Sequence, residues 1–318
     1  MSIISSDISK AVTILSNEDV VAIPTETVYG LAANIFSQKA IQRIFEVKQR
    51  PLFNPLIVHI HSIDQVSVLC SEFPDSAKQL ATAFWPGSLT LVLKKNEIVP
   101  DLITANKDTV GLRMPNHPVT IRLLRELNFP LAAPSANPFN RISPTKSIHV
   151  ADYFKDDIQM VLEGGECENG LESTIIGFEN DQPVLYRLGA ISVEEIESVV
   201  GPIQVNNKVK KTPDAPGMLA KHYAPQTKTF LVDELDLFLG LYPNKRIATI
   251  TFCEDVNAPN VVHTEVLSAS GDLKEAASKL YSTLHKLDRL NLDMIVAQRF
   301  PSVGLGASIN DRLERATK

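Results

Sequence analysis

The chain has 318 residues, of which 44% are hydrophobic and 21% charged, a length that suffices for one large domain or two ordinary ones. Its 31 basic and 37 acidic residues give a formal charge of −6, which argues against a protein that coats nucleic acid but leaves room for a local basic patch. Cys70, Cys167 and Cys253 lie too far apart for a disulfide framework or a zinc motif.

The first residues of the chain lack the basic segment and continuous apolar run of a targeting signal. No stretch approaches the ~20 apolar residues that a membrane span needs. Together with the isolated cysteines, these features lead us to expect a cytoplasmic protein without a membrane association.

The first predicted elements form one unit that ends at His61. A helix over residues 7–17 leads into a strand over 20–23, which stops at Pro24. Apolar residues from Ala40 to Val47 repeat with a helical period, and this helix ends before Pro51. A strand over residues 56–61 follows. Cations, hydroxyls and an amide therefore gather where elements end, which is where binding sites tend to lie.

The chain up to residue 204 continues to alternate between strands and helices. Helices are predicted over residues 63–70, 76–84, 118–127, 145–153 and 192–200. Strands are predicted over residues 89–93, 110–114, 131–133, 160–162, 172–177 and 183–187. Seven or eight strands with interleaved helices predict an α/β fold.

The composition changes between Gln204 and Thr229, where three prolines and no sustained period indicate a linker. Beyond it, alternating strands and helices predict a small Rossmann-like βαβ domain. Its predicted strands are 230–232, 246–252, 261–267 and 293–300, and its helices are 233–241, 272–287 and one from Asn310 onwards. We therefore predict a catalytic domain over residues 1–204, a linker over 205–228 that covers the active site, and a second domain over 229–318.

Lys48 and Arg50 stand at the end of the second predicted helix. The helix dipole favours cations there by about 0.3–1 kcal/mol each, so their position alone does not require a ligand. Asn54, His59 and Thr27, however, are expected to lie close by. A phosphate chain needs several positive and hydroxyl donors in one concavity, and this grouping indicates an anion site.

Arg113 lies inside an apolar strand, VGLRMP, where a buried arginine needs either an internal carboxylate or an anionic ligand. The sequence leaves both alternatives open. His59 and His61 share one face of a strand, but no acidic residue or cysteine has matching spacing, so a hydrogen-bonding role is favoured over a metal site. The Gly304–Gly306 pair is an incomplete dinucleotide fingerprint, because position 309 is Ile, and it is more typical of a tight turn.

Many motifs of the chain occur in the order and spacing of YrdC-like proteins. They are PTETVYGLAAN, the Lys-x-Arg at Lys48, NPLIVHI, WPGSLTLVL, VGLRMP, APSAN and ESTIIG. APGMLAKHYAP and the closing GLGASINDRLERA resemble the long, two-domain threonylcarbamoyl-AMP synthases. The resemblance covers nearly the whole chain.

This resemblance implies a twisted, largely open α/β domain with a concave, positively charged cavity. It also implies an ATP-dependent nucleotidyltransferase that converts L-threonine, bicarbonate and ATP to L-threonylcarbamoyl-AMP and pyrophosphate. That reaction is the first step in forming N6-threonylcarbamoyladenosine in tRNA, and its product would pass to a tRNA threonylcarbamoyl transferase. Mg²⁺ would be carried by ATP, with no protein side chain as a metal ligand.

The resemblance also assigns site residues. The L-threonine site would consist of Thr27, His59, Arg113 and Ser173. The ATP site would consist of Lys48, Arg50, Asn54, Thr109, Ser135, Ser143, Arg187 and Tyr223. Lys48 and Arg50 would act in catalysis through their charge, without a covalent nucleophile. The linker departs from the family pattern at Leu219 and Ala220, where a basic and an aromatic residue are usual, and ATP should still pull it closed.

Two other functions compete with this interpretation. An RNA-binding module could use the same concave surface, although the negative net charge and the buried Arg113 disfavour it, and weak RNA binding could also accompany the enzyme activity. A carbamoyl-transfer or regulatory domain could act on another acceptor. Such proteins carry zinc-finger or acylphosphatase-like segments, and none is recognisable in this sequence.

Overall fold

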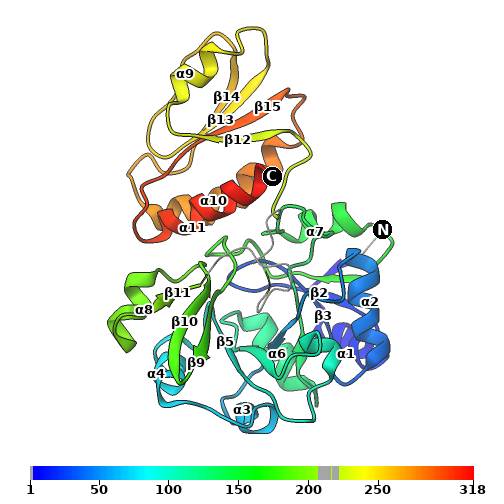
Figure 1. Ribbon diagram of the computed structural model, residues 1–318. Helices are drawn as coiled ribbons and strands as arrows, with labels where there is room; N and C mark the ends of the chain where they lie inside the picture. The colour runs from blue at the N-terminus through cyan, green and yellow to red at the C-terminus, as the bar shows by residue number, and fades with distance from the viewer. Residues whose placement is uncertain (1–2, 207–215, 217–221) are drawn as a thin grey trace.

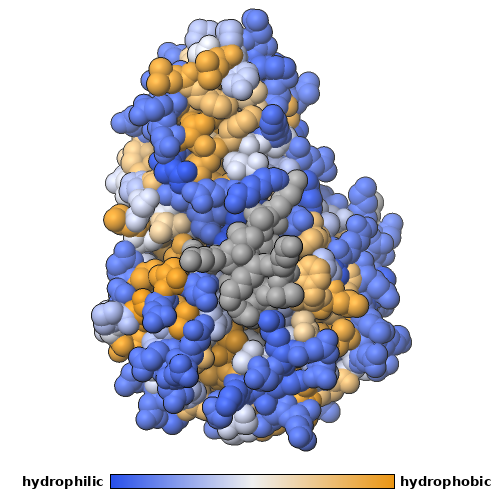
Figure 2. Space-filling view, viewed as in Figure 1, coloured by the Kyte–Doolittle hydropathy of each residue, from blue (hydrophilic) through white to orange (hydrophobic). Residues whose placement is uncertain are grey.

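A computed structural model describes residues 3–206, 216 and 222–318, which form two α/β units stacked end to end (Figure 1). The larger unit holds the N-terminal two thirds of the chain, and the smaller one holds the remainder. Most of the predicted linker, with Leu219 and Ala220, lies outside the described residues, so the predicted closure over the site stays a prediction. On the face seen in Figure 2, most residues along the perimeter of both units are hydrophilic.

The larger unit is built on one mixed sheet of eleven strands. Its strands are β1 (Ile3–Ser5), β2 (Val21–Ile23), β3 (Gly30–Asn34), β4 (Ile57–His59), β5 (Leu89–Lys94), β6 (Thr109–Arg113), β7 (Leu131–Ala132), β8 (Met160–Leu162), β9 (Thr174–Glu179), β10 (Gln182–Arg187) and β11 (Gln204–Val205). They lie in the order β1-β8-β2-β3-β7-β4-β6-β5-β9-β10-β11. Because β4, β6, β9 and β10 are near neighbours in this order, residues at the ends of these strands can lie close together.

Helices interleave with these strands. They are α1 (Ile8–Ser16), α2 (Gln38–Lys48), α3 (Asp64–Leu69), α4 (Asp75–Phe84), α5 (Asp101–Thr104), α6 (Pro118–Glu126), α7 (Ser147–Phe154) and α8 (Val193–Val200). Local chemistry sets where several of them begin: the side chains of Asp7 and Ser37 accept hydrogen bonds from backbone N–H groups in the first turns of α1 and α2, and Ser192 forms a capping box with Glu195. These helices were predicted close to their observed bounds, except for α5, which was not predicted.

The smaller unit has a four-stranded sheet with only parallel neighbours, in the order β12-β15-β13-β14. Its elements are β12 (Thr229–Val232), α9 (Leu235–Gly240), β13 (Ile247–Thr251), β14 (Val261–Val266), α10 (Leu273–Leu287), β15 (Met294–Gln298) and α11 (Leu305–Ala316). Parallel pairing is what βαβ connections produce. The predicted α/β fold class, with a Rossmann-like second unit, is therefore confirmed.

The start of the last helix was predicted wrongly. α11 begins at Leu305 rather than at Asn310, so the Gly304–Gly306 pair opens the helix. Gly304 has a φ of +50°, which favours glycine, and a Cβ on Gly306 would lie 1.9 Å from the carbonyl oxygen of Pro301. The backbone conformation at the start of α11 thus accounts for both glycines.

Helices α10 and α11 lie on the side of the smaller unit that faces the larger one (Figure 1). Val28, Ile142 and Leu171 of the larger unit belong to the same buried hydrophobic cluster as residues of α10 and α11. Polar contacts cross the boundary as well: Ser308 donates to the carbonyl oxygen of Gly189 at 2.8 Å. The two units therefore share one core at their junction. Within the described ranges, no helix is both long and apolar enough to span a membrane.

Candidate active site

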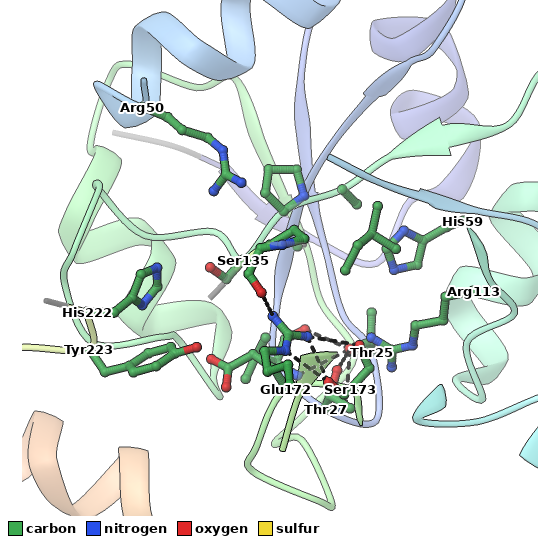
Figure 3. Close-up of a pocket in the computed structure, with 17 residues that line it drawn as sticks. Thr25, Thr27, Arg50, His59, Arg113, Ser135, Glu172, Ser173, His222 and Tyr223 are labelled. Carbon is green, nitrogen blue, oxygen red and sulfur yellow. Dashed lines mark hydrogen bonds between the residues drawn. The ribbon is translucent and has the colours of Figure 1, made fainter. Parts of the chain in front are cut away.

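A cavity lies at the strand ends of the larger unit, next to the smaller unit. The space between its atoms amounts to about 560 Å³, part of which is open to solvent. It is lined by Thr25, Thr27, Val28, Gly30, Arg50, Ile57, His59, Arg113, Ala133, Pro134, Ser135, Glu172, Ser173, Arg187, Pro216, His222 and Tyr223. Figure 3 shows Arg50 on one side of this cavity and His59 and Arg113 on the other, with Glu172 and Ser173 between them.

The sheet brings several of these residues together. β4 and β6 are parallel and pair His59 with Arg113, so the two side chains leave the same ends of adjacent strands. Ser173 directly precedes β9, and Arg187 is the last residue of β10, which is antiparallel to β9. Residues from distant parts of the chain therefore converge because of the strand order.

Arg113 is neutralised from inside the protein. Its Nη2 donates to Oε1 of Glu26 at 2.6 Å, and its Nε donates to the carbonyl oxygen of Gly87 at 3.2 Å. Glu26 also accepts from the backbone N–H of Asn116 at 3.0 Å. Burial alone would raise the pKa of Glu26, but the charge of Arg113 and these hydrogen bonds lower it. Of the two partners that the sequence left open, the internal carboxylate is present, and Arg113 still lines the cavity.

His59 is a neutral group in this cavity. Its burial and the nearby charge of Arg113 lower its pKa to about 3, so the imidazole is uncharged near neutral pH. Within the part of the chain that the structure describes, its Nδ1 has no hydrogen-bond partner. A buried ring nitrogen of this kind is available to a polar ligand.

Hydroxyl groups lie beside these two residues. The hydroxyls of Thr25 and Thr27 are 2.8 Å apart, and those of Thr90 and Ser173 are 2.7 Å apart. Arg187 holds Ser173 from the other side, because its Nη2 donates both to the Ser173 carbonyl at 2.8 Å and to the Ser173 hydroxyl at 3.0 Å. The rotamers of these small polar groups are thus fixed before any ligand binds.

Arg50 and Lys48 occupy different positions although they are two residues apart. The Arg50 guanidinium lines the cavity, and its Nη2 donates to the carbonyl oxygen of Pro55 at 2.8 Å. Burial and the nearby charge of Arg187 lower the pKa of Arg50 to about 9. The Lys48 ammonium is buried and instead donates to the carbonyl oxygens of Ser135 and Asn137. Lys48 therefore braces the backbone beneath Ser135, and it is not among the lining residues.

The structure brings most of the predicted site residues to this cavity. Eight of them line it: Thr27, Arg50, His59, Arg113, Ser135, Ser173, Arg187 and Tyr223. Lys48, Asn54, Thr109 and Ser143 do not. Thr109 lines a smaller hollow that shares Ile57 and Pro216 with the cavity.

Glu172 and His222 also line the cavity and were not predicted. For Glu172 a signal existed, because the segment ESTIIG that it opens is otherwise uncharged. Burial keeps His222 neutral by lowering its pKa to about 3. His222 and Tyr223 belong to the predicted linker, and their rings lie 4.0 Å apart.

The described residues do not form a metal site. No group of three or more His, Cys, Asp or Glu residues among them could hold an ion. The carboxylates of Glu26 and Glu172 are each paired with an arginine. Among the cysteines, Cys70 and Cys167 are buried, Cys253 is exposed, and all three are free.

Two family models match the chain. One, Sua5_yciO_yrdC, described as telomere recombination, matches residues 13–189, and the other, the C-terminal domain of threonylcarbamoyl-AMP synthase, matches residues 191–317. The first match alone covers more than half of the chain. The chain belongs to the threonylcarbamoyl-AMP synthase family.

Relatives agree with this family over both units. The threonylcarbamoyl-AMP synthase of Pyrococcus abyssi is 41% identical over 93% of this chain and 90% of its own, and that of Bacillus subtilis is 38% identical over 97% and 92%. Among solved structures, P. abyssi Sua5 complexed with L-threonine matches 99% of this chain and 98% of its own, at 38% identity and a TM-score of 0.93. Escherichia coli YciO matches 62% of this chain and all of its own, at 25% identity and a TM-score of 0.56. The resemblance inferred from the motifs is confirmed.

Proposed function

We propose that this protein synthesises L-threonylcarbamoyl-AMP from L-threonine, bicarbonate and ATP, with release of pyrophosphate. The observation that carries this proposal is the arrangement of Arg113 on one side of the cavity and Arg50 on the other (Figure 3). Two anions, a carboxylate and a phosphate chain, can therefore be held facing each other. Three arginines against one carboxylate in the lining support the predicted positive charge of the cavity.

The reaction joins two anions, and the arginines of the cavity can hold both of them. The threonine amine and bicarbonate yield a carbamate and water, and a carbamate oxygen then attacks the α-phosphorus of ATP. The bond from that phosphorus to the bridging oxygen breaks, and pyrophosphate leaves with the electron pair. Arg113 would hold the threonine carboxylate, and Arg50 and Arg187 the phosphates, so the rate acceleration comes from positioning and charge stabilisation.

We assign the threonine end of the cavity to Thr27, His59, Arg113 and Ser173. All four line the cavity, His59 pairs with Arg113 across β4 and β6, and Glu26 behind Arg113 fixes its guanidinium. P. abyssi Sua5 complexed with L-threonine, whose fold this chain shares, supports a threonine site.

We assign the nucleotide end to Arg50, Ser135, Arg187 and Tyr223, with Thr109 in the adjoining hollow and with Asn54 and Ser143 behind the wall. Asn54 supports this assignment, because both polar atoms of its buried side chain are without a partner in the described part of the chain. Direct contact of Lys48 with ATP would require its ammonium to leave two carbonyl oxygens. We therefore propose that Lys48 acts by holding the backbone at Ser135 in place.

We also propose that Mg²⁺ enters on the phosphates of ATP. The residues described here do not fit a protein-held ion, because the two buried carboxylates at the cavity, Glu26 and Glu172, are engaged by arginines. The product would pass to a tRNA threonylcarbamoyl transferase. The domain organisation that we propose remains 1–204, 205–228 and 229–318. The separate sheets support it, whereas the two family models divide the chain earlier, near residue 190.

A pyrophosphate-release assay tests this function. ATP, L-threonine and bicarbonate are each omitted in turn, and we expect release to fall to background in every case. Release that continues without threonine would overturn the proposal. Salt-dependent RNA binding without any release would instead favour the RNA-binding alternative.

A further inference from the structure

Glu172 places a carboxylate on the wall of a cavity that we propose to hold ATP. It directly precedes Ser173, and its side chain is only 7% exposed. A negative charge in this position opposes the binding of a polyanion, and the effect is strong where water is scarce. Binding of ATP therefore requires other groups that compensate the charge of Glu172.

The smaller unit supplies such groups. Arg312 of α11 donates from Nε to Oε2 of Glu172 at 2.9 Å, and the Tyr281 hydroxyl of α10 donates to the same oxygen at 2.9 Å. The other carboxylate oxygen accepts from the Ser143 hydroxyl at 2.6 Å. Both oxygens are thus occupied, and a carboxylate engaged in this way is a poor general base.

Arg312 is itself fully enclosed. Its side chain is 0% exposed, its Nη2 donates to the carbonyl oxygen of Leu188 at 2.6 Å, and its guanidinium lies 5.0 Å from the ring centre of Tyr223. Asp311 provides a further carboxylate for Nη1 at 2.5 Å. A buried arginine with so many partners has one defined orientation.

Arg187 is the second arginine whose charge acts on Glu172. In the part of the chain that is described, the hydrogen bonds that Arg187 donates go to Ser173 and Pro216 and not to Glu172. Glu172 is nevertheless near enough to influence Arg187 electrostatically. Removing Arg312 would leave Glu172 free to pair with Arg187.

We propose that Arg312 is a positioning residue that the C-terminal unit contributes to the active site: it neutralises Glu172 and keeps it from Arg187, so that the positive charge of Arg187 acts on the phosphates of ATP. This inference rests on the proposed function. It gives the smaller unit a direct role in nucleotide binding. A purely structural role for Arg312 would be confined to holding the two units together.

The test uses full-length Arg312→Met, Glu172→Gln and the double variant. We expect Arg312→Met to raise the KM for ATP about tenfold or more, because it exposes an uncompensated carboxylate, and to change the KM for threonine less than about threefold. Adding Glu172→Gln should restore the KM for ATP to within about threefold of the parent chain, because it removes the repelling charge. ATP affinity measured by calorimetry should follow the same order without turnover.

Two further variants serve as controls. Arg289→Met removes the exposed pair of Arg289 with Asp152, which also joins the two units, and should leave both KM values unchanged. Arg312→Lys retains the charge but not the planar set of donors, so it should raise the KM for ATP by less than about tenfold, which gives a result even where Arg312→Met does not fold.

Three outcomes would overturn the inference. They are a double variant no better than Arg312→Met, equal increases in both KM values, and an Arg312→Lys chain that folds but loses ATP affinity as Arg312→Met does. Failure of the parent chain to release pyrophosphate in a threonine-dependent manner would contradict the proposed function instead. The two failures are therefore distinguishable.

Discussion

Two buried ion pairs flank the cavity, and they present opposite charges to it. In the pair of Glu26 and Arg113 the arginine lines the cavity and the carboxylate lies behind it. In the pair of Glu172 and Arg312 the carboxylate lines the cavity and the arginine lies behind it. The first pair forms within the larger unit, whereas the second joins the two units.

On the site assignment that we propose, this difference predicts which part of the molecule controls which substrate. The threonine end is complete within the larger unit, because Arg113 and the glutamate that orients it both belong to that unit. The nucleotide end depends on the smaller unit for charge compensation. Breaking the two pairs should therefore affect different substrates, and the following predictions test this from the largest effect to the smallest.

Arg113→Ala should give the largest effect, because it removes the cation of the threonine end and leaves Glu26 buried without its partner. We expect the KM for threonine to rise about 100-fold and the KM for ATP to change far less. Steady-state pyrophosphate release with each substrate varied measures both constants. The matched control is Arg125→Ala, an exposed arginine of α6, which should behave as the parent chain. Equal losses for both substrates would contradict the assigned role.

Arg50→Ala should have the reverse selectivity. It removes one of two guanidinium groups at the nucleotide end, so we expect the KM for ATP to rise about tenfold while the KM for threonine stays within about twofold. The same assay applies. A selective loss of threonine use would show that the two ends of the cavity have been assigned in reverse.

Acid should weaken the pair that joins the units. Burial alone would raise the pKa of Glu172, but Arg312 and Arg187 lower it to about 2 from an ordinary value of 4.5. The folded protein thus binds this proton less readily than the unfolded chain, so the stabilisation is present above pH 4.5 and is lost as the pH falls towards 2. The neutral buried His59 and His222 add a loss of the same sign below pH 6.5, since their pKa values are about 3.

Glu172→Gln isolates the contribution of Glu172 in denaturant unfolding measured between pH 7 and pH 3. The variant should be less stable than the parent chain at pH 7, and the difference should shrink as the pH falls below 4.5. A difference that stays constant over this range would mean that the charge of Glu172 does not contribute to stability.

An exposed pair should show the smallest effect. Arg122 and Glu126 form a 3.0 Å pair on α6, where the Arg122 side chain is 71% exposed. Arg122→Ala should change the free energy of unfolding by less than about 0.5 kcal/mol, because water competes for both charges. If Arg122→Ala lowered the free energy of unfolding as much as Glu172→Gln does at pH 7, burial would not explain why the two cavity pairs stabilise the protein.

Much of the fold could be predicted from periodicity and turn residues, and the exceptions have physical causes. β3 was missed because Gly30–Asn34 is buried on both faces and shows no alternation. β1 and β11 are edge strands of three and two residues, too short to show a pattern, and β1 pairs with the distant β8. The beginning of α11 was misplaced because two glycines normally indicate a turn.

The site was predictable in part for a similar reason. Arg113 was noticed because a charge inside an apolar strand is costly, but its partner Glu26 lies 87 positions away in the chain. Glu172 and Arg312 are separated by 140 positions and belong to different units. Counter-ions of this kind depend on tertiary packing, so local sequence patterns do not reveal them.

The most direct test of the account follows labelled bicarbonate into the product. The parent chain is incubated with ATP, L-threonine and labelled bicarbonate, and the products are separated and identified by mass spectrometry. We expect one compound that contains the label, threonine and AMP, formed together with an equal amount of pyrophosphate. AMP or pyrophosphate formed without threonine, or a product that lacks the label, would contradict the account.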